Sequence, residues 1–185
     1  MAFELYDERN RLRPAITFAV MLVLAVSAAW VLVYSYALNT VNVGQSMEPT
    51  IENDETVLID RVCYHFSRPA RYDVIAYDQK IAGTGEDTDI KRIIGLPGER
   101  ICIRDGHVLI NGQMLTEGGQ FDQVQLAGIA ADEIELGEGE YFVLGDKRQS
   151  SEDSRFENIG NIPEEAVIGR VWLRIQPLKR LGYIE

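Results

Sequence analysis

The sequence predicts a mostly β fold, an antiparallel β domain that follows a single N-terminal transmembrane helix. Residues 15–38 form an apolar run without a charged residue or a proline. From residue 55 onward the chain breaks into short segments rich in β-branched and apolar residues, with turn residues between them. The 185 residues, 46% of them apolar, suffice for one domain with a core. We therefore expect a tail over 1–13, a transmembrane helix over 14–38 and a β domain over 39–185.

The N-terminal apolar run is long enough to cross a membrane. A helix needs about 20 apolar residues to span the hydrocarbon core, and residues 15–38 exceed that length. Pro14 suits the first turn of a helix. The aromatic residues Trp30, Tyr34 and Tyr36 lie toward the far end, where such side chains favour the membrane interface. A cleaved signal peptide, cut near Ser27–Ala29, is the alternative, but its apolar segment would be shorter than this run.

The distribution of positive charge predicts the orientation of this helix. Arg9, Arg11 and Arg13 precede the apolar run, and no further Lys or Arg appears until Arg61. Basic residues flanking a membrane helix stay on the cytoplasmic side. We therefore expect a single-pass plasma-membrane protein in contact with the lipid bilayer, with its tail in the cytoplasm and its β domain outside.

The β domain is predicted from strands and turns in order. The expected strands are ETVLID, DVIAYD, DIKRII, RICIR, HVLI, EYFVLG and VIGRVWLRI. Asp105-Gly106 and Asn111-Gly112 are dipeptides that favour two-residue hairpin turns, in which both residues have positive φ. The sequence Leu96-Pro97-Gly98-Glu99 is typical of a type II turn. Residues 83–89 and 116–140 are polar and glycine-rich, and we expect surface loops there.

Composition excludes several classes of protein. A formal net charge of −11 argues against a nucleic-acid partner, because binding phosphates needs a basic surface. Cys63 and Cys102 are too few for a zinc site or a disulfide scaffold, and each is expected to pack as a small apolar residue, although a disulfide between them stays possible. We expect no metal and no cofactor.

Ser46 and Lys91 are candidates for chemistry. A serine in a short connecting segment is usually a turn or cap residue, but Ser46 follows the apolar run closely and would lie near the membrane. A serine nucleophile needs a base, and neither His65 nor His107 has the context of a catalytic triad. Lys91 lies among isoleucines, whose burial would favour its neutral form. Strand alternation puts Lys91 and Arg92 on opposite faces, so we expect one of them to face the packed side.

A third candidate segment, residues 144–160, follows an expected strand and mixes acidic, basic and hydroxyl side chains. A solvated surface loop is one interpretation. The other is a set of ion pairs and hydroxyl groups that orients a catalytic lysine.

Four segments in this order resemble the type I signal peptidases, which are membrane-anchored Ser–Lys proteases also called leader peptidases. They are GQSMEPTI, RYDVIAYD, DIKRIIGLPGERI and GDKRQSSEDSR. The similarity extends from the apolar run to about Val171, and the short spacings resemble the compact Gram-positive type. The resemblance implies a β domain of the signal-peptidase type. It also implies a serine endopeptidase that removes signal peptides from secretory preproteins, with small residues before the cut.

The resemblance also implies the roles of individual residues. Ser46 would be the nucleophile, and its backbone N–H would be one donor to the oxyanion. Lys91 would be the general base. The Ser151 hydroxyl would bond the Lys91 amine and orient it.

The resemblance implies that further residues support the Ser46–Lys91 pair. Asp153 and Arg155 would form an ion pair near the site, and Asp146 would support the loop that carries them. Met47 and Pro49 would contact the substrate or the membrane.

Four positions depart from the family pattern. Gly44 stands where some members have a serine whose hydroxyl is the second oxyanion donor. Tyr72 and Asn53 each replace a glycine, and Lys147 replaces an asparagine. None of these departures removes the nucleophile or the base, but the departure at Gly44 leaves open an inactive, membrane-tethered homologue that serves as a binding or scaffold protein. A self-cleaving repressor of the SOS type is a second alternative, but the membrane-length apolar run and the acidic charge argue against it.

Overall fold

The computed structural model describes residues 2–85, 87–116, 121 and 123–184, with the backbone alone at residues 2–12, 15, 32 and 34–38. The chain divides into two compact units, Met1–Ala37 and Leu38–Glu185.

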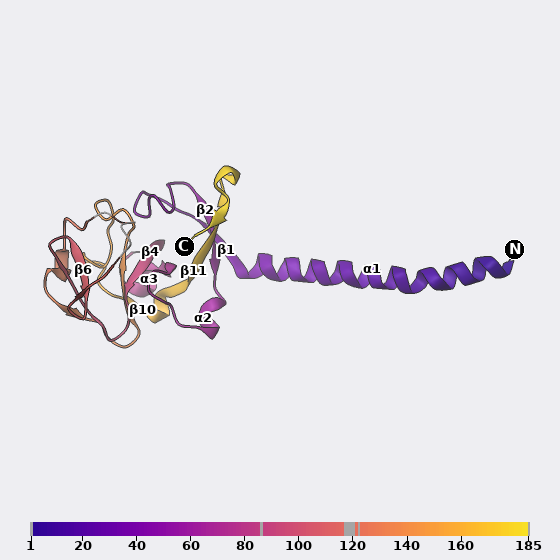
Figure 1. The fold of residues 1–185 in the computed structure, drawn as a ribbon, viewed down its shortest axis with the longest axis horizontal. Helices are drawn as coiled ribbons and strands as arrows, with labels where there is room; N and C mark the ends of the chain where they lie inside the picture. Colours follow the sequence, from indigo (N-terminus) through magenta and orange to yellow (C-terminus); the bar gives the residue numbers. More distant parts are fainter. Residues whose placement is uncertain (1, 86, 117–120, 122, 185) are drawn as a thin grey trace. The chain divides into compact units, whose positions relative to one another are not determined.

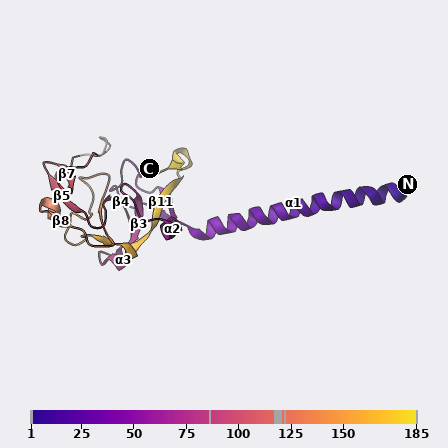
Figure 2. The ribbon, with the colours of Figure 1, turned by 60° about the horizontal axis from the view of Figure 1, so that its bottom comes forward.

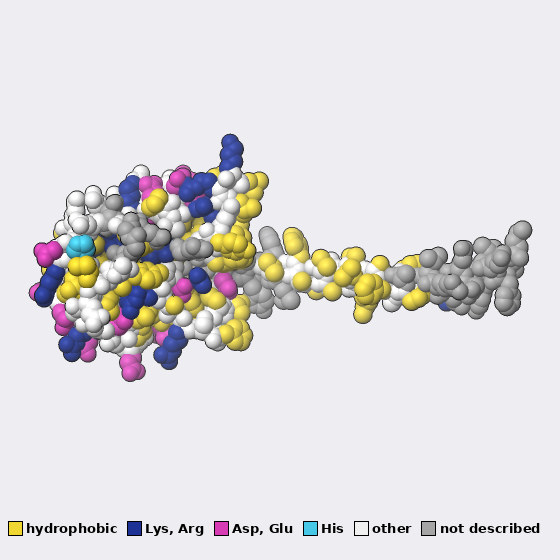
Figure 3. Space-filling model, in the orientation of Figure 1, with side chains coloured by type: hydrophobic (Ala, Val, Ile, Leu, Met, Phe, Trp, Pro, Cys, Tyr) yellow, Lys and Arg dark blue, Asp and Glu magenta, His cyan; other side chains and the backbone are white. Residues whose placement is uncertain are grey.

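The first unit is the helix α1, Ala2–Tyr36. It begins before Pro14, where the sequence predicted its first turn, because residues 2–13 are rich in helix-forming Glu, Leu and Arg. Pro14 therefore lies inside the helix, and the Thr17 hydroxyl donates to the Arg13 carbonyl at 2.9 Å. Apolar side chains are exposed along the described part of α1 (Figure 3).

Within the residues described, no helix combines the length and the apolar character that crossing a membrane requires. The side chains of Arg9, Arg11, Tyr34 and Tyr36, which carried part of the anchor argument, lie outside the described ones. The anchor over 14–38 and its orientation stay predictions.

The second unit is built on an eight-stranded sheet with the strand order β1-β2-β11-β3-β4-β9-β10, and β12 pairs with β11. Its strands are β1 (Ala37–Val41), β2 (Thr56–Asp60), β3 (Val74–Asp78), β4 (Thr88–Gly95), β9 (Glu140–Leu144), β10 (Ile162–Pro163), β11 (Val167–Gln176) and β12 (Gly182–Tyr183). Every strand pair in it whose register is described is antiparallel, as predicted. Short helices lie in the connections: α2 (Cys63–Phe66), α3 (Gln79–Ala82), η2 (Glu164–Ala166) and η3 (Leu178–Arg180).

A smaller sheet of four strands, in the order β7-β6-β5-β8, completes the unit. Its elements are β5 (Arg100–Arg104), β6 (His107–Ile110), β7 (Gln113–Met114), η1 (Gly128–Ala131) and β8 (Ile134–Glu135). Figures 1 and 2 place this sheet to one side of β3, β4 and β11. The two predicted hairpin turns connect its strands: Asp105 and Gly106 have φ of 51° and 79°, and Asn111 and Gly112 have φ of 52° and 77°.

Strand β4 is buried on both faces. Lys91 is 2% exposed and Arg92 is 3% exposed. Ile90 packs in one apolar cluster and Ile93 in another, so each face of this strand meets a core. The sequence predicted that one of the two cations would face the packed side; both do, because the sheet is covered on either side.

The two cysteines, Cys63 and Cys102, are free and do not form a disulfide with each other.

Candidate active site

Ser46 lies in a turn between β1 and β2. The turn is closed by backbone bonds, from the Glu48 N–H to the Gln45 carbonyl at 3.1 Å and from the Ile51 N–H to the Met47 carbonyl at 2.9 Å. The Ser46 carbonyl accepts the backbone N–H of Lys147 at 3.0 Å. The serine turn is thereby fixed to the loop that follows β9.

Lys91 extends from β4 toward this serine. Its Nζ lies 3.4 Å from Ser46 Oγ, and it also donates to the Ile90 carbonyl at 3.3 Å. The Lys91 side chain is only 3% exposed. The structure therefore brings the two candidate residues to within 3.4 Å of each other, a long hydrogen bond of the kind common in catalytic sites without substrate, in a setting that largely excludes water.

Asp89 is a charged neighbour of Lys91 that sequence reasoning did not single out. Its Oδ2 lies 2.6 Å from Lys91 Nζ. The sequence did contain a signal for this contact: Asp89 and Lys91 are two residues apart on a strand, and such residues point to the same face. Without coordinates, however, the pattern cannot tell whether such a carboxylate contacts the lysine or reaches solvent.

Asp146 ties β4 to the serine turn. Its two carboxylate oxygens accept from Arg92 Nε and Nη2, both at 2.7 Å. The Thr50 hydroxyl donates to Asp146 Oδ2 at 2.5 Å. Asp146 and Arg92 are both buried, so this charge-assisted pair is shielded from water.

Asp153 and Arg155 form a second buried pair, in the loop after β9. Arg155 Nε and Nη2 donate to the two Asp153 oxygens at 2.7 and 2.8 Å. Asp153 Oδ2 also accepts the Gly145 N–H at 3.0 Å. The pair fixes the start of the loop that holds the Ser46 carbonyl.

Ser151 does not make the bond expected of it. Its Oγ is buried but has no hydrogen-bond partner within the described part of the chain. The Lys91 amine bonds to Asp89 instead, because a carboxylate is a stronger acceptor for an ammonium group than a hydroxyl. Ser151 nevertheless lies beside the site: a Cβ built on Gly145 would fall 2.2 Å from Ser151 Oγ and 2.6 Å from the Ser46 carbonyl oxygen.

Met47 and Pro49, expected at the substrate or membrane surface, differ in exposure. Met47 is 0% exposed and packs in the core with Ile51 and Val57, because its side chain points inward from the turn. Pro49 is exposed and lines a cavity of about 310 Å³ with Glu48, Glu52 and Asn53. Only Pro49 of the two is placed where it could touch a ligand.

Two departures from the family pattern contact each other. The Gly44 N–H donates to Asn53 Oδ1 at 2.7 Å. Gly44 has a φ of +100°, a conformation that residues with a Cβ rarely adopt. The backbone conformation of this turn therefore disfavours the serine that some family members have at this position.

The other two departures have physical accounts as well. Tyr72 has a φ of 73°, which explains why glycine is the common residue there. Lys147 Nζ donates to Gln45 Oε1 at 2.9 Å and to Glu48 Oε2 at 2.7 Å. Lys147 thus binds residues on both sides of Ser46.

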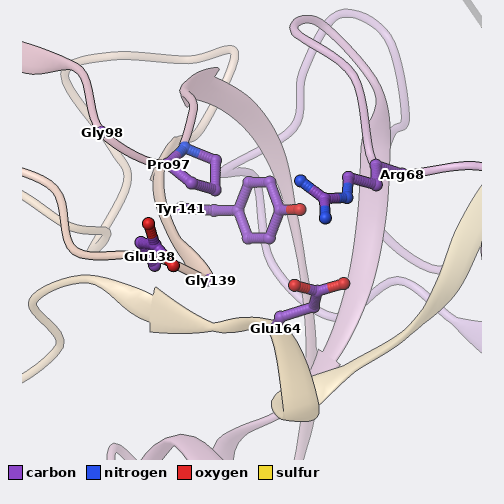
Figure 4. A pocket seen from close by; sticks show the side chains of 7 residues that line it. All are labelled: Arg68, Pro97, Gly98, Glu138, Gly139, Tyr141 and Glu164. Atoms are coloured by element: carbon purple, nitrogen blue, oxygen red, sulfur yellow. The ribbon is translucent and has the colours of Figure 1, made fainter.

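A larger cavity, of about 560 Å³, lies elsewhere in the β unit (Figure 4). Arg68 and Glu164 flank the Tyr141 hydroxyl in this view, and burial, then the Glu164 charge, raise the pKa of the Tyr141 phenol. None of the expected site residues lines this cavity.

A serine hydroxyl beside a buried lysine amine is the arrangement that a serine–lysine hydrolase needs. A family model described as signal peptidase, peptidase S26, matches residues 14–176. The chain belongs to this family.

Similar proteins carry the same family name. A probable signal peptidase I-2 from Synechocystis sp. is 34% identical over 147 residues, which are 76% of this chain and 64% of that protein. A signal peptidase I from Leptolyngbya laminosa is 36% identical, covering 75% of this chain and 68% of its own length. A crystal structure of a signal peptidase I from Enterococcus faecalis is 31% identical, covers 57% of this chain and 97% of that chain, and has a TM-score of 0.47. The chain therefore spans about two thirds of the two cyanobacterial relatives.

Proposed function

We propose that this chain is a type I signal peptidase, a membrane-bound serine endopeptidase that removes N-terminal signal peptides from secretory preproteins. The observation that carries the proposal is the 3.4 Å separation of Lys91 Nζ from Ser46 Oγ at a buried position. Membership of the signal peptidase family agrees with it. Ser46 is the nucleophile and Lys91 the general base.

The reaction is peptide-bond hydrolysis through an acyl-enzyme. The neutral Lys91 amine takes the proton of Ser46 Oγ as this oxygen attacks the scissile carbonyl. The resulting ammonium group gives the proton to the leaving amine, which is the new N-terminus of the mature protein. Water, deprotonated by the same amine, then attacks the acyl-enzyme and releases the signal peptide with a free carboxylate.

The surrounding residues act on the geometry of this pair. The Asp153–Arg155 and Arg92–Asp146 ion pairs fix the loop after β9 and the strand that carries Lys91. The Ser46 backbone N–H is one donor to the oxyanion. Ser151, whose buried Oγ has no described partner, would orient the Lys91 amine, as the family resemblance implies.

The substrate class follows from family membership and position. Preproteins with small residues before the cut bind extended, through main-chain bonds to a sheet edge. Pro49, exposed next to the serine turn, contacts the substrate or the lipid surface. The helix over 14–38 tethers the enzyme to the plasma membrane with the β domain outside, where a signal-peptide cleavage site emerges.

The test compares wild type with Ser46→Ala and Lys91→Met, each as the full chain in detergent, on a preprotein. We expect both variants to lose processing by about 10³-fold or more, as when the members of a catalytic unit are removed one at a time. Ser150→Ala and Lys80→Met, which alter exposed residues of the same types, are the controls and should process normally. Equal, poor processing by wild type and Ser46→Ala would instead support an inactive homologue with a binding or scaffold role.

A further inference from the structure

The Lys91 amine lies closer to a carboxylate than to the serine. Nζ is 2.6 Å from Asp89 Oδ2 and 3.4 Å from Ser46 Oγ. The Lys91 side chain is 3% exposed and the Asp89 side chain 23%. A charge-assisted bond of this length stabilises the ammonium form of the amine. That form cannot accept a proton from Ser46.

Two other elements hold the Asp89 carboxylate in place. The Tyr77 hydroxyl of β3 donates to Asp89 Oδ2 at 3.1 Å, and the Gln79 amide of α3 donates at 3.5 Å. Burial, and then the Asp89 charge, raise the pKa of the Tyr77 phenol above its ordinary value. The phenol therefore keeps its proton and remains a donor. Because these donors and the amine converge on one oxygen, the carboxylate fixes where the amine lies.

The other charges near this group have partners of their own. Asp153, whose charge acts on Tyr77, is paired with Arg155, and the Arg92 side chain on the opposite face of β4 is paired with Asp146. Lys80, the cation of α3, is exposed. Asp89 is therefore the charge whose removal should change the environment of the amine most.

We propose that Asp89 is a positioning residue for the reaction: its carboxylate holds the Lys91 amine beside Ser46 and sets the pH above which the enzyme works. This rests on the proposed function, because it takes Lys91 as the general base. Without the carboxylate the amine should become neutral at a lower pH, but it should also be less well placed.

The experiment measures kcat and KM against pH for the full chain in detergent, with a peptide that contains an Ala-x-Ala cleavage site. In Asp89→Asn the midpoint of the acidic limb should move to lower pH by about 1 unit or more, the usual effect of an adjacent opposite charge. At the plateau kcat should fall, while KM stays near the wild-type value. Asp87→Asn, which removes an exposed carboxylate two residues away, should leave the profile unchanged.

A second measurement needs no activity. In the Ser46→Ala background, the lysine Cε signals can be followed by NMR as the pH changes; the lysines of the chain are Lys80, Lys91, Lys147 and Lys179. The titration midpoint of the Lys91 signal should fall when Asp89→Asn is added. Asp89→Ser, which is smaller and also uncharged, replaces Asp89→Asn if the latter does not fold.

The outcomes separate the two proposals. An Asp89→Asn profile and Lys91 titration that both match wild type would overturn the role of Asp89 and leave the Ser46–Lys91 pair intact. Cleavage that persists in Ser46→Ala would overturn the proposed function, while the NMR titration would still report whether Asp89 controls the charge on Lys91.

Discussion

At the scale of single residues, departures from the family pattern have local causes. Gly44 adopts a left-handed φ and donates its N–H to Asn53, so the two departures act together. Apart from Gly44 itself and its two neighbours in the chain, no described atom would lie within 4 Å of a Cβ on Gly44. Backbone strain, rather than a steric clash, therefore disfavours at Gly44 the serine that some family members have.

This argument predicts the result of restoring that serine. Gly44→Ser should lower the free energy of unfolding by about 1–2 kcal/mol, the cost of a left-handed conformation for a residue with a Cβ. Urea unfolding of the full chain measures it. The matched control is Gly182→Ser, since Gly182 does not have a positive φ and its Cβ would lie at an ordinary 3.8 Å from the Arg180 carbonyl. Equal losses in both variants would contradict the strain argument.

At the scale of elements, β4 presents two functional side chains on its two faces. Lys91 meets the serine turn and Asp89, whereas Arg92 meets the Asp146 carboxylate of the loop after β9. The alternation of the strand thus separates a residue proposed for chemistry from a residue that holds the site together.

The buried pair of Arg92 and Asp146 should therefore contribute more to stability than an exposed pair at β5 of the smaller sheet. Asp146→Ala removes the carboxylate that balances the charge of the buried Arg92 guanidinium, and we expect a loss of about 3–5 kcal/mol in unfolding free energy. Arg100, whose side chain is 58% exposed, lies 3.6 Å from Glu133. Arg100→Ala should cost less than about 1 kcal/mol, as exposed ion pairs do. Urea unfolding of both variants measures these losses, and equal unfolding free energies for the two variants would contradict the argument.

Local sequence predicted the elements whose determinants are local. The turns at Asp105-Gly106 and Asn111-Gly112 could be predicted because two adjacent residues determine the conformation of each turn. The two-residue strands β8, β10 and β12 were not predicted, because each exists only through pairing with a distant strand. The resemblance to a family joined Ser46 to Lys91, but the contact of Asp89 with that amine depends on side-chain geometry that no local pattern encodes.

At the scale of the whole molecule, the proposed function needs the enzyme at a membrane. The anchor over 14–38 is a prediction from length and lack of charge. A tether would raise the effective concentration of the enzyme at cleavage sites that emerge from the bilayer.

The anchor is tested in cell membranes. The full chain should remain in the membrane pellet after an alkaline carbonate wash, whereas a chain that lacks residues 1–38 should be released. Protease added to intact spheroplasts should digest the β domain if it lies outside. Release of the full chain by carbonate, or protection of its β domain, would contradict the predicted topology.

The contact at Gly145 has a consequence for engineering. Because Gly145 has a hydrogen where other residues have a Cβ, the Ser46 carbonyl and the Ser151 hydroxyl can both lie close to its backbone. Segments that lie far apart along the chain must therefore match each other in shape. A chimaera that borrows the nucleophile segment from a relative would have to borrow the loop around Gly145 with it.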